Sequence, residues 1–251
     1  MDSERHISWP PPLADVQKPG LFLDFDGTLV ELAAGPQAVS LSGRLGDLLP
    51  ALALKLQGAA AIVSGRPVEQ LRRLLPLGIP TIVGLHGAET WYADGRHDRI
   101  PVDQALRDVV QRRLEDFAGR ARGVLFEDKG SNYALHFRAA PEQAGACHAI
   151  VEALAAESAG ALCVRPGNMV VELGPAGIDK GTAVSAIMGH EPFAGRRPVF
   201  VGDDLTDEDG FAASAAMGGF GILVGPMRPT HASARLESVN AVRAWLTEFV
   251  R

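Results

Sequence analysis

The chain alternates short apolar runs with stretches of helical periodicity, and this alternation constrains its fold more than any other feature. Helical patterns lie between the runs, for example from Leu45 to Leu56 and from Val68 to Leu75. Strands that are apolar on both faces and alternate with helices are typical of a parallel sheet covered on both sides. We therefore expect an α/β fold with a parallel sheet. The apolar runs are residues 21–25, 58–65, 79–87, 198–204 and 220–225.

The middle of the chain follows a different pattern. Apolar residues at helical spacing predict a helix over 103–118, and a second helix is expected from about Pro141 to Ser158. Each is followed by a predicted hairpin, the first over 123–138 and the second over 161–175, with the second turn at Pro166–Asn168. Helix, hairpin, helix and hairpin indicate a small antiparallel sheet with two helices on one face.

These patterns predict a parallel-sheet domain interrupted by an insertion. The N-terminal stretch is rich in proline and mixed charge and has no apolar segment typical of a signal peptide. The expected divisions are a flexible lead-in over 1–20, a core built from 21–91 and 176–251, and an inserted α/β unit over 92–175.

Two carboxylates stand where the first apolar run ends. Asp24 and Asp26 follow Leu21–Leu23, and an ionised carboxylate in such surroundings is costly unless a partner or a cation compensates it. The two-residue repeat of a strand places both on one side, with Phe25 turned the other way. A simple turn sequence is the alternative reading of "DFDG". Ligands of parallel sheets bind beyond the carboxyl ends of the strands, so the pair marks a candidate site.

Other apolar runs end in equally useful groups. The second ends in Ser64, followed by Gly65 and Arg66, and the fourth ends in "GDDLTDEDGF", which holds five acidic residues between positions 203 and 209. Such crowding of negative charge suggests a bound cation, Mg²⁺ in particular, although a solvated turn that caps a helix would look similar. Lys180 stands at an expected helix start, where it could meet an anion or extend into solvent.

Together these groups fit phosphoryl transfer through an aspartyl-phosphate. Asp24 would attack phosphorus, and Mg²⁺ would be held by Asp24, Asp203 and the backbone carbonyl of Asp26. Asp26 would protonate the leaving alcohol and then deprotonate the attacking water. Ser64 and Lys180 would bind the phosphoryl oxygens, and Thr28 would orient Asp26 or bind one of these oxygens.

The ordered motifs "DFDGT", "SGR", "DKG" and "GDDLTDED" resemble those of the haloacid dehalogenase superfamily of phosphatases. More specifically, "GLHGAE", "EDKGSNYALHFR" and "VVELGP" resemble the trehalose-6-phosphate phosphatases, and the similarity extends from about Leu21 to Leu223. The resemblance implies a Rossmann-like, haloacid dehalogenase-like core with an inserted α/β cap. It also implies a free-standing Mg²⁺-dependent phosphatase acting on trehalose 6-phosphate.

The resemblance further assigns roles to residues. It implies Asp24 as nucleophile, Asp26 as acid and base, and Asp24, Asp26 and Asp203 as the magnesium ligands. Asp204 and Asp207 would support the site without binding the ion, Asp207 by orienting Lys180 or a water. The expected substrate-binding residues are Thr28, Arg66, His86, Glu127, Lys129, Arg138 and Glu172, with His136 as a weaker candidate; His86 could equally be a hydrogen-bonded structural residue, and Glu127 and Lys129 part of an ordinary charged turn.

The composition excludes some classes of binding partner. The net charge is −6 and no basic stripe is present, so we expect no nucleic-acid partner. No run approaches the ~20 apolar residues of a membrane span. The two cysteines, Cys147 and Cys163, match no metal spacing and suggest a reducing cytoplasm. We expect a monomer that binds a small phosphosugar.

Three alternatives remain open at this level. Phosphatases for sucrose phosphate or mannosyl-phosphoglycerate, and phosphomannomutases, share this kind of cap. A non-catalytic sugar-phosphate sensor could be built on the same fold, although it would have no use for both a nucleophile and a proton donor.

Overall fold

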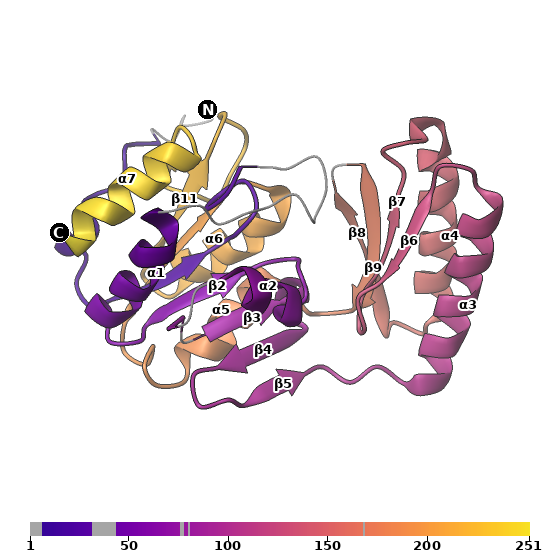
Figure 1. Ribbon diagram of the computed structural model, residues 1–251, viewed down its shortest axis with the longest axis horizontal. Helices are drawn as coiled ribbons and strands as arrows, with labels where there is room; N and C mark the ends of the chain where they lie inside the picture. The colour runs from indigo at the N-terminus through magenta and orange to yellow at the C-terminus, as the bar shows by residue number, and fades with distance from the viewer. Residues whose placement is uncertain (1–6, 32–43, 76–77, 80, 168) are drawn as a thin grey trace. The chain divides into compact units, whose positions relative to one another are not determined.

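The computed structural model describes residues 7–31, 44–75, 78–79, 81–167 and 169–251 (Figure 1). The chain forms two compact units. The first unit combines the N-terminal part up to Asp98 with Asp179–Arg251, and the second is the continuous insertion Arg99–Ile178. None of the described helices has the length and apolar composition needed to cross a membrane.

The first unit is built on one eight-stranded sheet, which is parallel from β12 through β3; β4 pairs antiparallel with β3, and β5 lies at the edge beyond β4. Near-continuous apolar sequence makes the central strands. Every residue of β1, β2 and β11 is buried, and so is every residue of β10 after Arg197. The strands in sheet order are β12 (Ala234–Leu236), β11 (Phe220–Val224), β10 (Arg197–Gly202), β1 (Pro19–Leu23), β2 (Ala60–Val63), β3 (Thr81–Gly84), β4 (Glu89–Tyr92) and β5 (His97–Arg99).

Helices cover this sheet. α1 and α7 pack against each other, and α5 and α6 form a second pair (Figure 1). The apolar faces of these helices share one core with the strands, which includes Phe22, Phe200 and Phe211. The helices are α1 (Arg44–Lys55), α2 (Val68–Leu74), α5 (Lys180–Met188), α6 (Glu208–Ala216) and α7 (Val239–Val250).

The inserted unit has its own sheet and its own core. Its antiparallel strands lie in the order β6 (Leu125–Asp128), β7 (Tyr133–His136), β9 (Val170–Pro175) and β8 (Leu162–Gly167). Helices α3 (Gln104–Arg120) and α4 (Ala144–Glu157) bury Val110, Leu114 and Val151 against one face of this sheet (Figure 1). The other face carries polar side chains, because alternate strand residues point away from the helices.

The expected α/β class with a parallel core sheet is confirmed, and so is the helix–hairpin–helix–hairpin order of the insertion. The second hairpin turns later than predicted, because Pro166 and Gly167 continue β8 and pair with Val171 and Val170. Proline is tolerated there since β8 is an edge strand and needs no second donor. Asn168 lies outside the described residues.

The boundaries of the insertion also differ from the predicted 92 and 175. Tyr92 ends β4 and His97 begins β5, so this hairpin extends the core sheet, and the division falls at Asp98 and Ile178. These strands were not predicted because they are short and carry mostly polar residues.

The prediction of a loose lead-in over residues 1–20 is wrong for its described part. Leu13 and Val16 are buried in the core, and the indole Nε1 of Trp245 donates to the Pro11 carbonyl oxygen at 2.9 Å. Two apolar side chains among prolines give no periodic signal, so the sequence pattern concealed this packing. Residues 1–6 lie outside the described residues.

Replacing Leu13 with alanine tests this packing. Leu13 is 1% exposed, so Leu13→Ala should lower the free energy of unfolding by about 2–5 kcal/mol through lost apolar burial and a residual cavity. Urea denaturation would measure the change. Trp9→Ala is the control, since Trp9 is 60% exposed and its loss should change stability little. Equal, small effects of both substitutions would mean that the segment is not part of the core.

Candidate active site

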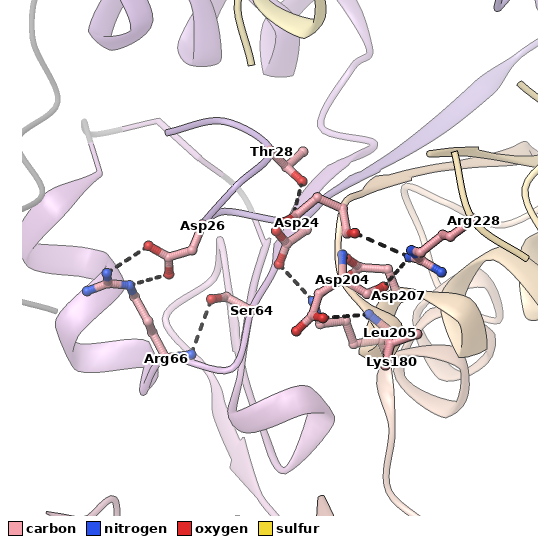
Figure 2. A network of polar contacts seen from close by, with 11 residues as sticks. Asp24, Asp26, Thr28, Ser64, Arg66, Lys180, Asp204, Leu205, Asp207 and Arg228 are labelled. Atoms are coloured by element: carbon pink, nitrogen blue, oxygen red, sulfur yellow. Dashed lines mark hydrogen bonds and ion pairs between the residues drawn. The ribbon is translucent and has the colours of Figure 1, made fainter. Parts of the chain in front are cut away.

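The candidate site lies where β1, β2 and β10 end. Leu23 pairs with Val201, and the next amide, Asp24 N, donates to the Val201 carbonyl at 2.9 Å. The parallel register therefore places Asp24 beside Asp203, which follows the last residue of β10. On the other side Ser64 follows β2, so the polar residues that end the three strands share one edge of the sheet (Figure 2).

Lys180 joins two carboxylates at this edge. Its Nζ donates to Asp24 Oδ1 at 2.7 Å and to Asp207 Oδ1 at 2.6 Å, and its side chain is 2% exposed. Lys180 is the first residue of α5, which starts sharply because Asp179 and Thr182 form a capping box. The alternative of a lysine extended into solvent is thereby excluded.

A third carboxylate completes the group. Asp24, Asp203 and Asp207 each offer an oxygen, and these atoms lie within 4.8 Å of one another. Asp203 Oδ1 accepts from the Thr28 hydroxyl at 3.2 Å. Gly27 makes the approach possible: its φ is 82°, and a Cβ there would lie 2.1 Å from Asp203 Oδ2.

The electrostatics reflect this crowding of charge. Burial raises the pKa of Asp203 to about 6, and the carboxylate of Asp207 adds to the rise. Burial likewise raises the pKa of Asp24 well above its ordinary value, against the opposing charge of Lys180. Burial alone would lower the pKa of Lys180, but Asp207 and Asp24 outweigh it, so that pKa is raised and the side chain stays an ammonium.

The distribution of contacts shows which oxygens could hold a cation. Asp24 Oδ2 is buried and has no hydrogen-bond partner among the described residues. Both oxygens of Asp207 are in use, one by Lys180 and the other by the backbone amide of Asp204 at 2.9 Å. Hard carboxylate oxygens in a buried, electron-rich group fit Mg²⁺, and Asp24 and Asp203 offer the oxygens that could hold it. This supports the predicted role of Asp207 as the residue that orients Lys180.

Asp26 faces a different partner. Arg66 donates to it twice, from Nε to Oδ2 at 2.5 Å and from Nη2 to Oδ1 at 2.7 Å (Figure 2). The Arg66 guanidinium also lies over the Phe25 ring, 5.6 Å from its centroid. The Arg66 backbone amide donates to Ser64 Oγ at 3.2 Å, so the "SGR" loop folds back on its own serine. The structure thus brings Arg66 to Asp26, whereas the sequence analysis assigned it to substrate.

The "GLHGAE" loop supports the "SGR" loop. His86 N donates to the Ser64 carbonyl at 3.0 Å, and His86 has a φ of 58°. Its imidazole lies against Gly65, where a Cβ would be 2.5 Å from Nε2. These contacts favour a structural role for His86, and its predicted role in substrate binding stays a prediction.

Charged residues predicted in the insertion gather on the polar face of its sheet. Lys129 Nζ lies 2.5 Å from Glu172 Oε1 and 3.9 Å from Glu127 Oε2, and His136 Nε2 lies 2.8 Å from Glu127 Oε2. The hydrogen bond with His136 holds the pKa of Glu127 below its ordinary value. Arg138 is exposed in the turn that follows β7.

Two residues outside the predicted site also hold its loops in place. Glu89 Oε1 accepts from the Val68 amide at 2.7 Å and so fixes the start of α2, directly after the "SGR" loop. Arg243 donates from Nε and Nη2 to the Leu29 carbonyl, at 3.0 and 2.7 Å, just beyond Thr28. A glutamate within a quoted motif was the available signal for Glu89, while Arg243 stands in an ordinary amphipathic helix.

The fold is similar to that of solved phosphatases of the haloacid dehalogenase superfamily. A Bacteroides thetaiotaomicron phosphatase of that superfamily superposes with a TM-score of 0.64 over 96% of this chain and 97% of its own, at 16% identity. The C-terminal domain of trehalose-6-phosphate phosphatase from C. albicans reaches a TM-score of 0.83 over 99% of both chains, at 20% identity. At these identities the likeness shows the fold.

Sequence comparison identifies the family. The sequence profile described as trehalose-phosphatase matches residues 22–240. A probable trehalose-phosphate phosphatase of Sinorhizobium fredii is 39% identical over 231 residues, which cover 92% of this chain and 86% of the relative. The trehalose-6-phosphate phosphatase of Escherichia coli is 36% identical over 226 residues, covering 90% and 84%. This chain belongs to the trehalose-phosphatase family.

The raised pKa of Asp203 predicts how metal binding depends on pH. Without metal, the folded state binds the Asp203 proton more tightly than the unfolded chain does. The contribution of Asp203 to the free energy of unfolding therefore falls as pH rises from about 4 through about 6. Mg²⁺ competes with that proton. The rise in melting temperature caused by Mg²⁺ should therefore be large at about pH 7.5 and much smaller at about pH 5.

Asp203→Asn is the matching variant for this prediction. It removes the titrating group and a ligand, so Mg²⁺ should raise its melting temperature little at either pH. An equal Mg²⁺ effect on the unaltered protein at both pH values would contradict the assignment of Asp203 as a ligand.

Proposed function

We propose that this protein hydrolyses trehalose 6-phosphate to trehalose and phosphate, with Mg²⁺, through a phosphoryl group carried on Asp24. The observation that carries the proposal is the Asp24 carboxylate: one oxygen is held by Lys180 and the other is buried without a partner among the described residues. Because one oxygen is fixed and the other has no partner, the free oxygen is available to attack phosphorus. Membership in the trehalose-phosphatase family supports the substrate.

In the first half-reaction Asp24 attacks phosphorus and the P–O bond to the sugar breaks. The leaving sugar oxygen takes a proton from Asp26. Lys180 and Ser64 donate to the phosphoryl oxygens, and the Lys180 ammonium offsets their negative charge. The products are free trehalose and Asp24 in the acyl-phosphate form.

In the second half-reaction water attacks the same phosphorus. Asp26, now ionised, accepts a proton from the water, and the Asp24–phosphorus bond breaks to release phosphate. Asp24 returns as a carboxylate. The cycle consumes one water and needs no other reactant.

Asp24 and Asp203 would hold the ion, with the Asp26 carbonyl as a proposed third ligand. When bound, Mg²⁺ supplies positive charge that lets a carboxylate approach an anionic phosphoryl group. Thr28 donates to the Asp203 carboxylate that would hold this ion.

Asp26 must exchange its partner before it can act. In its two-bond pair with Arg66 it is an acceptor only, so it has no proton to donate. Release of Arg66 lets Asp26 take up a proton from solvent, which it then donates to the leaving sugar oxygen. Release also frees the guanidinium to bind a phosphoryl oxygen, the role predicted for it from sequence.

We further propose that the polar face of the inserted sheet recognises the sugar and makes the insertion a specificity cap. Glu127, Lys129 and Glu172 lie together there and present charged groups suited to sugar hydroxyls. We also propose a cytoplasmic location, which the two free cysteines support, and a monomeric state.

Asp24→Asn should abolish turnover of trehalose 6-phosphate. Asparagine keeps the shape and an acceptor for Lys180 but lacks the nucleophilic oxygen pair, so phosphate release should fall at least about a thousand-fold. Asp47→Asn is the control, because Asp47 is an exposed carboxylate on α1. Released phosphate, measured with and without Mg²⁺, is the readout.

A panel of phosphosugars tests the substrate itself. Trehalose 6-phosphate should exceed glucose 6-phosphate and mannose 6-phosphate by far. Preferred hydrolysis of sucrose phosphate or mannosyl-phosphoglycerate would replace the proposed substrate. Tight binding with no phosphate released would favour the sensor.

Glu172→Ala separates sugar recognition from phosphoryl chemistry. Loss of this carboxylate should lower kcat/KM for trehalose 6-phosphate about 10- to 100-fold and change turnover of a small aryl phosphate little, since the latter has no sugar to bind. Glu157→Ala is the control, because Glu157 lies on α4 and pairs with Arg113. Equal losses on both substrates would show that Glu172 does not read the sugar.

A further inference from the structure

Arg228 reaches the acidic loop from outside the predicted motifs. It lies in the connection between β11 and β12, and its Nη2 donates to the carbonyl oxygens of Asp203 and Asp204, at 3.2 and 2.7 Å. Figure 2 shows its guanidinium pointing at the backbone of this loop. A charged donor on two successive carbonyls is a strong restraint on the peptide planes between them.

Arg228 is itself held in place. Its Nη1 forms an ion pair with Glu208, the first residue of α6, and the two side chains are only 21% and 16% exposed. The second oxygen of Glu208 accepts from Thr230 Oγ1 at 3.1 Å and from His231 N at 2.7 Å. Glu208 therefore fixes both the arginine and the segment that carries it.

The acidic loop is thus restrained on both sides of its backbone. Arg228 donates to the carbonyls of Asp203 and Asp204, and Asp207 Oδ2 accepts from the Asp204 amide at 2.9 Å. The Asp203 carboxylate lies close against Gly27, where an added Cβ would be 2.1 Å from its Oδ2. A rotation of the 203–204 peptide would turn this carboxylate away from Asp24.

We propose that Arg228, backed by Glu208, is a positioning residue that sets the Mg²⁺ affinity of this site by holding the Asp203–Asp204 backbone. The inference rests on the proposed metal site and adds a determinant that lies outside its ligands. The contacts of Arg228 are with Glu208 and with backbone carbonyls, not with the carboxylate oxygens that would hold the ion. Residues that orient ligands in this way typically change metal affinity by about 10- to 100-fold when they are replaced.

The test is Mg²⁺ binding by isothermal titration calorimetry, without substrate. Arg228→Gln should raise the dissociation constant for Mg²⁺ about 10- to 100-fold, and Arg228→Lys, which keeps the charge and one donor, should fall between. In activity assays Arg228→Gln should need a correspondingly higher Mg²⁺ concentration for half-saturation and recover most of its kcat when Mg²⁺ is saturating. Glu208→Gln should weaken binding in the same direction and be non-additive with Arg228→Gln.

Arg197→Gln is the matched control. Arg197 also donates to a backbone carbonyl, that of Gly218 at 2.6 Å, but it lies at the opposite end of β10 from Asp203. The Mg²⁺ affinity of the Arg197→Gln variant should equal that of the unaltered protein. Arg228→Lys keeps the test decisive if Arg228→Gln does not fold.

The outcomes distinguish this inference from the proposed function. If the unaltered protein binds no Mg²⁺, both fail. If it binds Mg²⁺ and the folded Arg228 variants bind equally well, only the role of Arg228 is overturned. A loss of thermal stability in those variants with unchanged Mg²⁺ affinity would likewise overturn it, because the arginine would then be merely structural.

Discussion

One buried ammonium group holds the acidic edge of the sheet together. Lys180 contacts Asp24 and Asp207 at hydrogen-bond distance, and all three side chains are almost fully buried. Removing one partner from such a group typically costs about 3–5 kcal/mol, because a charge is left buried and uncompensated. With Asp203, three carboxylates face one ammonium and two negative charges remain. One divalent cation would neutralise these two charges. The ion proposed for catalysis would therefore also stabilise the folded site.

The sequence predicted those parts of the structure that repeat or that follow from topology. The central strands are apolar on both faces, and strand parity together with the rule for parallel sheets was enough to expect Asp24 beside Asp203. The sequence did not predict β4, β5 and β12, because short, partly exposed strands carry no such pattern. The pairing of Asp26 with Arg66 was not predicted either, since a long flexible side chain can reach several groups from one backbone position.

Residues that hold loops from outside form the second class of omissions. Glu89, Arg243 and Arg228 each contact the backbone of a different loop of the site. Their side chains act through hydrogen bonds to amides and carbonyls, which leave no trace in hydrophobic periodicity. Such contacts preorganise a site by removing freedom from its loops before substrate arrives.

The position of β1 in the sheet has a consequence for synthesis of the chain. β1 lies between β2 and β10, but Arg197, where β10 begins, is 174 residues beyond Leu23. At about 5–20 residues per second, the ribosome needs roughly 10–35 s to deliver it. During that interval one edge of an apolar strand has no neighbour, while the insertion emerges with a core of its own. The nascent chain must therefore keep its future central strand from pairing with another molecule until β10 has been made.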